Sequence, residues 1–170
     1  FMPKEPVQVI TPSSVSETKI PENNVLTILI DPEGRIFMNL DDKRPDMKKE
    51  VLQLMGQDYG ITFTDKQIRS FQEQTHIGVP IGQMSAFLNK SLSDQDSEIK
   101  TMGVPIDSTN NQFARWIKHA RVIGGDNMGI AIKADQNTQF PLVDRVMKAL
   151  VKVKENRYSL ITSLRGAPDV

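Results

Sequence analysis

The chain has 170 residues, in which 21 Lys or Arg balance 21 Asp or Glu, and it contains no cysteine. This length is enough for one domain with a core, and zero net charge argues against the broad positive field of a nucleic-acid-binding protein. The absence of cysteine excludes disulfides, thiolate nucleophiles and cysteine metal sites. The longest apolar run, VLTILI at 25–30, is far shorter than the ~20 residues of a membrane-spanning helix.

Residues 1–24, FMPKEPVQVITPSSVSETKIPENN, are rich in Pro, Ser, Thr, Glu and Asn and carry few large apolar side chains. Such a segment buries too little apolar surface to offset its ordering entropy, so we expect an extended, mobile arm. Within the arm, PVQVI alternates as a strand does. Because the chain opens FMPKEP without an initiator methionine in first place, we expect its native start, with a membrane anchor, to lie upstream.

Order is expected to begin at VLTILIDPEGRIFMN. Two β-rich runs, 25–31 and 35–39, flank Asp31-Pro32-Glu33-Gly34, in which Pro suits the second turn position and Gly tolerates positive φ. This pattern predicts a hairpin. A helix should follow over 45–56, with Pro45 in its first turn, and its apolar face is predicted from Met47, Val51, Leu54 and Met55.

Residues 61–112 have the least regular pattern. DKQIRSFQEQ and GQMSAFLNKSL each favour a short helix, SDQDSE favours a polar loop, and GVPI occurs at both 78–81 and 103–106. Four repeated residues are weak evidence for a duplicated unit. We interpret 61–112 as an insertion of helices and loops between the two halves of a smaller fold.

The rest of the chain alternates helices and strands. A helix with one apolar stripe is predicted around Phe113, Trp116, Ile117 and Ala120, followed by a strand at 128–134, a helix at 140–153 and a strand at 158–164. The buried face of the last helix is predicted from Phe140, Val143, Val146, Met147, Leu150 and Val151. The order predicts an α+β fold over 25–164, in which a small mixed sheet has the helices near 45–56 and 140–153 packed on one face. Residues 165–170 are expected to form a frayed tail.

Few residues suggest catalysis. His76 and His119 are the only histidines and form no zinc motif, and no nucleophile elbow, P-loop or dinucleotide-binding glycine pattern occurs. Asp41 and Asp42 precede a helix and are interpreted as capping residues. We therefore predict no catalytic residue, no metal or cofactor site and no enzyme activity. The alternative from another class is a small hydrolase that uses His76 or His119 with an aspartate.

Asp135 lies at a corner between an apolar strand and a helix, in GIAIKADQNTQF. A lone Asp in that position most often accepts backbone N–H bonds that fix the turn. A catalytic Asp would need a second titratable partner, and only Lys133 is near in sequence. We interpret Asp135 as a structural residue of the corner.

These segments resemble the periplasmic domain of the ExbD/TolR family. In that family a strand ends in Arg/Lys-Ala-Asp, an aromatic residue opens a helix, and an apolar stripe precedes the last strand. The matching positions are Lys133, Ala134, Asp135, Phe140, Val146, Met147, Leu150 and 158–163, and the hairpin positions Asp31, Gly34, Arg35 and Ile36 also match. KIPENNVL resembles the proline-bearing entry to that hairpin. The resemblance covers 20–57 and about 113–164, whereas 61–112 has no counterpart in the compact members and the family's membrane helix is missing.

The resemblance implies a non-enzymatic subunit of an inner-membrane complex driven by the proton-motive force. ExbD-type members work with an ExbB-like channel subunit and a TonB-like protein to energise outer-membrane transport, and this domain would be periplasmic. The alternative is a TolR-like envelope-integrity protein that binds peptidoglycan. No nucleic acid and no cofactor are expected.

Two places are expected to contact partners. The last strand of an open sheet offers unpaired backbone groups to a second copy, so we predict a homodimer around it. The arm should add as a strand along a sheet edge. The candidate partner-binding residues are Val7, Val9, Ile20, Pro21, Tyr158, Leu160 and Thr162.

Overall fold

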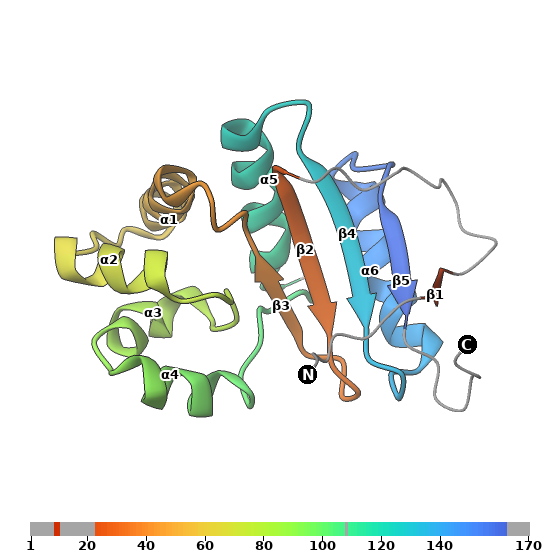
Figure 1. Ribbon diagram of the computed structural model, residues 1–170, viewed down its shortest axis with the longest axis horizontal. Helices are drawn as coiled ribbons and strands as arrows, with labels where there is room; N and C mark the ends of the chain where they lie inside the picture. The colour runs from red at the N-terminus through yellow and green to blue at the C-terminus, as the bar shows by residue number, and fades with distance from the viewer. Residues whose placement is uncertain (1–8, 11–22, 108, 163–170) are drawn as a thin grey trace.

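A computed structural model describes residues 9–10, 23–107 and 109–162 of the chain (Figure 1). The described residues form one sheet, six helices and their connections. In chain order the elements are β1 (Val9–Ile10), β2 (Val25–Ile30), β3 (Ile36–Asn39), α1 (Pro45–Tyr59), α2 (Asp65–Glu73), α3 (Ile81–Leu88), α4 (Leu92–Ile99), α5 (Gln112–Gly124), β4 (Gly129–Ala134), α6 (Phe140–Lys152) and β5 (Ser159–Thr162).

The sheet has five strands in the order β1-β5-β4-β2-β3. β2, β4 and β5 are parallel, whereas β3 and β1 pair antiparallel at the two ends of the order. The register aligns the carboxyl ends of the parallel strands, with Ile30 beside Ala134 and Ala134 beside Thr162. This mixed sheet confirms the predicted α+β class.

One face of the sheet is covered by helices. Along β2 the residues alternate between buried and half-buried, so that Leu26, Ile28 and Ile30 point into the core. α5 and α6 lie behind this face, while α1 lies beside α5 rather than behind the centre of the sheet (Figure 1). The prediction that α1 and α6 cover this face is therefore wrong for α1, because α5 lies in the position predicted for α1.

The turn between β2 and β3 forms as its residues predict. Gly34 has φ of 87° and its N–H bonds the Asp31 carbonyl at 2.9 Å, while the Asp31 N–H bonds the Arg35 carbonyl at 3.0 Å. A side chain at position 34 would also collide with Leu142 of α6, 2.8 Å from the place of a Cβ. The hairpin is confirmed, and its Gly serves both the positive φ and the close approach of α6.

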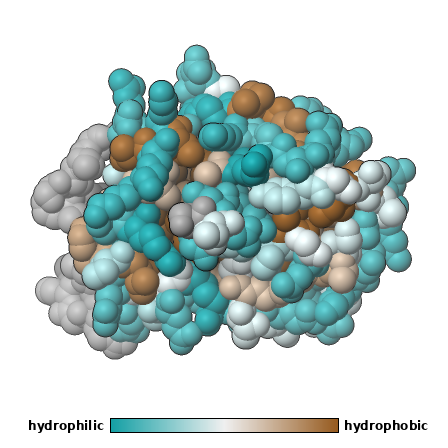
Figure 2. Space-filling view, turned by 180° about the vertical axis from the view of Figure 1, so that it is seen from behind, coloured by the Kyte–Doolittle hydropathy of each residue, from teal (hydrophilic) through white to brown (hydrophobic). Residues whose placement is uncertain are grey.

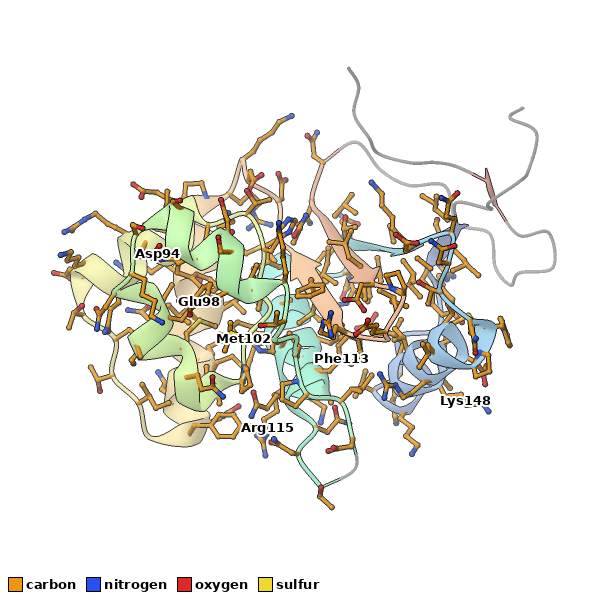
Figure 3. All side chains as sticks on the ribbon, turned by 90° about the horizontal axis from the view of Figure 1, so that it is seen from below. Asp94, Glu98, Met102, Phe113, Arg115 and Lys148 are labelled. Carbon is orange, nitrogen blue, oxygen red and sulfur yellow. The ribbon has the colours of Figure 1, made fainter. Side chains whose placement is uncertain are left out.

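The stripe predicted on α5 is confirmed. Phe113, Trp116, Ile117 and Ala120 are at most 1% exposed. The Trp116 ring stacks on Phe71 of α2, with ring centroids 6.0 Å apart and planes 11° from parallel. In Figure 3, Phe113 lies in the middle of the molecule, between α4 with Asp94 and Glu98 and α6 with Lys148. The inserted helices therefore share one hydrophobic core with the sheet.

The segment 61–112 contains one more helix than its sequence suggests. Thr64 and Gln67 form a capping box at the start of α2, which the pattern predicts as a helix. SDQDSE, predicted as a polar loop, is part of α4, because the Ser91 side chain accepts the Asp94 N–H at 3.1 Å and starts a helix there. Gln95 of α4 is fully buried. The loop prediction is wrong because this polar residue faces inward.

The inserted segment also covers the outer side of β3. The Met38 N–H donates to the Ile77 carbonyl at 2.8 Å and the Ile77 N–H donates back at 2.7 Å. Val104 N–H donates to the Ile36 carbonyl at 2.9 Å. The two GVPI copies meet here, since the N–H of Gly103 donates to the carbonyl of Gly78 at 2.6 Å. These bonds close the β3 edge of the sheet.

Three side-chain predictions are corrected. On α1, Leu52 is fully buried, whereas Leu54 is only half-buried. On α6, Phe140 is 63% and Val151 52% exposed, and Met147 is partly buried. The buried face predicted for α6 is too wide, whereas that of α1 is displaced, because it includes Leu54 in place of Leu52.

The capping role predicted for Asp41 and Asp42 is also wrong. Arg44 precedes α1, and no side chain in the described part of the chain caps that helix. Asp41 instead accepts the N–H groups of Lys43 and Asn24, each at 2.9 Å, and the bond from Lys43 is the main cause that lowers the pKa of its carboxyl. Asp42 accepts from the buried ammonium of Lys48 at 2.7 Å. The two aspartates therefore fix the start of β2 and the base of α1.

Candidate partner-binding surface

β5 lies near the open end of the sheet. Its inner side pairs along its length with β4, from Ser159 beside Ala131 to Thr162 beside Ala134. On its outer side, β1 meets it at two positions only, with Val9 opposite Thr162 and Ile10 opposite Ile161. The inserted segment closes the β3 edge of the sheet. At the other edge of the described sheet, only the short strand β1 covers β5. Such a place suits the addition of another strand.

The structure places the candidate residues unequally. Val9 and Thr162 are brought opposite one another in the β1–β5 pair. Tyr158 and Leu160 are each only 7% exposed, so neither presents its side chain to a partner. Burial, and secondarily the nearby carboxylate of Asp144, raise the pKa of the Tyr158 hydroxyl. The predicted positions Val7, Ile20 and Pro21 lie outside the described residues, and a partner-binding role remains a prediction for all seven positions.

A second feature lies beside this edge. Phe140, Met147 and Val151 are spaced by seven and four residues and thus share one side of α6, away from the buried line of Val143, Val146 and Leu150. Leu142 and Arg145, on another side of α6, lie against Gly34 of the β2–β3 hairpin, so the side with Phe140 turns away from the hairpin. Seen from the helical side, the surface is largely hydrophilic with separate hydrophobic areas (Figure 2). Sequence reasoning placed Phe140 and Val151 in the core, although their spacing already separates them from the buried line.

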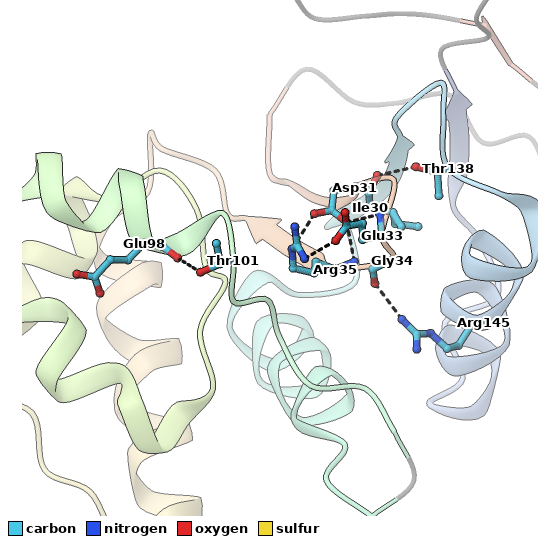
Figure 4. Close-up of polar contacts among 9 residues, drawn as sticks. All are labelled: Ile30, Asp31, Glu33, Gly34, Arg35, Glu98, Thr101, Thr138 and Arg145. Carbon is cyan, nitrogen blue, oxygen red and sulfur yellow. Dashed lines mark hydrogen bonds and ion pairs between the residues drawn. The ribbon is translucent and has the colours of Figure 1, made fainter.

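The corner at Asp135 joins two strands and α6. The carboxylate of Asp135 is exposed and its Oδ1 accepts the Asn137 N–H at 2.8 Å, while its own N–H donates to the Ile30 carbonyl at 3.0 Å. Figure 4 shows Thr138 bonding the same carbonyl and Arg145 of α6 bonding the carbonyl of Gly34, at 3.3 and 2.9 Å. The geometry is that of a turn holding the carboxyl ends of β2 and β4 together.

The two histidines lie in different places. His119 Nε2 is 2.6 Å from Oδ2 of Asp58, which also lies 3.3 Å from Arg115, and the bond from His119 is the main cause that lowers the pKa of Asp58. Among the described residues neither histidine has a hydroxyl partner, which a hydrolase nucleophile would provide. No group of three metal-binding side chains occurs in the described part of the chain. The His119 pair links α1 to α5.

These observations define an α+β domain with a strand edge and an apolar helix side next to it. The chain belongs to the ExbD/TolR family of biopolymer transport proteins, since the model of that family matches residues 1–165. The match extends over the arm and over 61–112, beyond the segments that carry the resemblance in the sequence. No curated protein and no solved structure gives a significant match.

Family membership makes this chain an accessory protein of biopolymer transport, from a family of membrane-anchored proteins. In the ranges that the structure describes, no helix has the length and apolarity needed to cross a bilayer.

Proposed function

We propose that this chain is the periplasmic part of an ExbD-type subunit, which works with an ExbB-like channel subunit in the inner membrane and passes proton-motive force to a TonB-like protein. The observation that carries the proposal is the short β1–β5 pairing at the outer end of the sheet. Main-chain pairing at such an edge is a common way to capture an extended peptide. Through it, the subunit energises TonB-dependent transport across the outer membrane.

The pairing suits a contact that must form and break in each cycle. Two residue pairs contribute little, because isolated two-stranded pairings are marginal in water even when longer. A partner strand that pairs along all of β5 would form more hydrogen bonds than β1 does and could take its place. Exchange of strands at β5 therefore needs no unfolding of the domain core.

An NMR titration of the chain with a periplasmic fragment of a TonB-like protein tests the proposal. Backbone amides from 158 to 161 should shift, and those of α3 and α4 should not. Val9→Pro removes one backbone donor from β1 and should weaken the β1–β5 pair with which the partner strand competes, so the affinity for the fragment should rise while the melting temperature stays unaltered. Val9→Thr keeps the donor and serves as the control. Absence of shifts in β5 together with shifts elsewhere would reject the edge as the binding surface.

We also propose that the chain forms a homodimer around the same end, with a second copy covering the apolar side of α6. Exposed apolar area on Phe140 and Val151, adjacent to β5, supports this occupant. Phe140→Glu should shift the light-scattering mass toward monomer. Val122→Glu, at a residue 72% exposed on α5, is the matched control and should leave the mass unchanged. A monomer at high concentration in the unmutated chain would contradict the proposal.

The TolR-like alternative has one observation in its favour. A polar cleft of about 560 Å³ lies between α1, α5 and the residues 109–111, and the exposed ring of Tyr59 borders it with Arg115 5.6 Å from the ring centroid. An aromatic ring among amides and charges suits a sugar polymer. Co-sedimentation with peptidoglycan that is lost in Tyr59→Ala would favour this function, and no co-sedimentation would remove it.

A further inference from the structure

The inserted segment forms a cavity against the sheet, at the opposite end of the sheet order from β5. Its volume is about 520 Å³, within the range of small-molecule sites. The floor is apolar and comes from Leu29 of β2, Phe37 of β3 and Ile99 of α4. The polar lining comes from the loop after α2, from α4 and the residue that follows it, and from the hairpin: Gln74, Thr75, His76, Asp96, Lys100 and Asp31.

The wall of this cavity is held in place by buried hydrogen bonds. The Gln74 side chain, 5% exposed, donates from Nε2 to Oε1 of the fully buried Gln95 at 3.0 Å. Gln95 in turn donates to Ser70 at 2.8 Å and to the Lys90 carbonyl at 3.0 Å. The buried ammonium of Lys48 donates to the Gln74 carbonyl at 3.3 Å. A ligand would thus enter a preformed site and would not have to order it.

His76 lines the cavity, and its contact with Asn39 defines the tautomer of its ring. One amide atom of Asn39 lies 3.0 Å from the Met38 carbonyl, 3.1 Å from the Thr75 carbonyl and 2.6 Å from His76 Nδ1; because two of these neighbours can only accept, we assign this atom as the amide nitrogen. Nδ1 therefore accepts, and the neutral ring carries its proton on Nε2. Burial is the main cause that lowers the pKa of His76, and the charge of Lys48 lowers it further, whereas Asp96 and Asp42 raise it. The lowered pKa favours the neutral ring.

Among the described residues around the cavity, the charges leave one cation available. Asp31 is neutralised, since its Oδ2 lies 3.0 Å from Arg35 Nε and its Oδ1 accepts the N–H groups of Glu33 and Arg35 (Figure 4). Lys100 is exposed and takes part in no ion pair with another described residue. From the described residues, Asp96, which is also exposed, accepts one long bond of 3.4 Å, donated by Gln74.

We propose that this cavity binds a small monocarboxylate with an apolar side group, such as an apolar α-amino acid, free or at the end of a peptide. The carboxylate would lie between the Lys100 ammonium and the Nε2–H of His76, and the apolar group would cover Phe37 and its neighbours. Asp96 disfavours ligands with two negative charges and favours one with an ammonium group. This site is independent of strand pairing at β5.

NMR titrations with L-phenylalanine, N-acetyl-L-phenylalanine, L-phenylalaninamide and glycine test the proposal. L-Phenylalanine should shift the signals of Phe37, His76 and Ile99 with a Kd on the order of millimolar, as a ligand of this size allows. N-acetyl-L-phenylalanine should bind more weakly, because it lacks the ammonium that faces Asp96. The carboxamide and glycine should bind at least tenfold more weakly than L-phenylalanine. Tighter binding of the N-acetylated compound would reject the role of Asp96 and assign the site to peptide carboxyl ends.

Variants separate the charge from the fold. Lys100→Met keeps the stem and should weaken L-phenylalanine binding about tenfold, whereas Lys66→Met, on the exposed surface of α2, should not change it. The ¹⁵N shifts of the His76 ring should report the Nε2–H tautomer in the free protein. A carboxamide that binds as well as the acid, a ring protonated on Nδ1, or no shift of the cavity residues by any of the compounds would overturn the proposal.

Discussion

Replacing Phe71 by Ala tests whether the inserted segment is an integral part of the domain. Phe71 belongs to α2, is 3% exposed and stacks on Trp116 of α5. Loss of a buried phenylalanine ring costs about 3–5 kcal/mol, of which the stacking contributes about 0.5–1.5 kcal/mol. For a domain of this size, each kcal/mol lowers the melting temperature by about 2–4 °C, so we expect a decrease of roughly 6–20 °C.

The assay uses the one tryptophan of the chain. Because Trp116 lies at the α2–α5 contact, its fluorescence reports on this contact while far-UV circular dichroism reports on the whole fold, and the two unfolding curves should coincide. Val122→Ala removes apolar atoms from a position 72% exposed, outside the proposed dimer surface, and should lower stability by less than about 0.5 kcal/mol. A loss below about 1 kcal/mol in Phe71→Ala, or two separate transitions in the unmutated chain, would refute the single core.

Three further predictions concern single residues. Asp135→Ala should lower the free energy of unfolding by about 1 kcal/mol in urea titrations, because the Asn137 N–H loses its acceptor; an unchanged stability with lost partner binding would instead make Asp135 a contact residue. Since burial lowers the pKa of His76, the unfolded chain takes up a proton first as the pH falls, so stability should decrease below pH ~6.5 until the folded-state pKa is passed. His76→Gln should reduce that slope, and an equal slope in both proteins would contradict the assignment. Lys154 follows the end of α6 with φ of 66°; its N–H donates to the Val151 carbonyl and the Glu155 N–H donates to the Leu150 carbonyl. Because Gly adopts this left-handed conformation without strain, Lys154→Gly should raise the free energy of unfolding by about 0.5–1 kcal/mol in the same titration. A destabilised variant would show that the lysine side chain matters more than the strain.

Local signals were sufficient for the parts of the fold that depend on near neighbours. The Asp31–Gly34 turn, the α5 stripe and the strands β2 to β5 follow from turn residues and periodicity. Lys154 is a counter-example, because Gly is the usual residue at that left-handed position and a lysine gives no sign of it.

The surfaces beside the sheet could not be predicted in the same way. Whether Phe140 is core or surface depends on what packs beside α6, and the apolar residues of that helix fit more than one buried face. The cover over β3 depends on Ile77 and Val104, which lie far along the chain from Met38 and Ile36. The resemblance to the family offers no guide there, since its compact members lack a counterpart of 61–112.

The central claim is that a partner strand adds at β5 and not at β3. The chain has no cysteine, so single cysteines can be placed at Ile161 of β5 and at Phe37 of β3, both half-buried on the sheet face opposite the helices. Each variant is oxidised with a TonB-like periplasmic fragment that carries one cysteine in its pairing segment. We predict that Ile161→Cys forms the cross-linked complex and Phe37→Cys does not; equal cross-linking of both, or cross-linking at position 37 alone, would contradict the account.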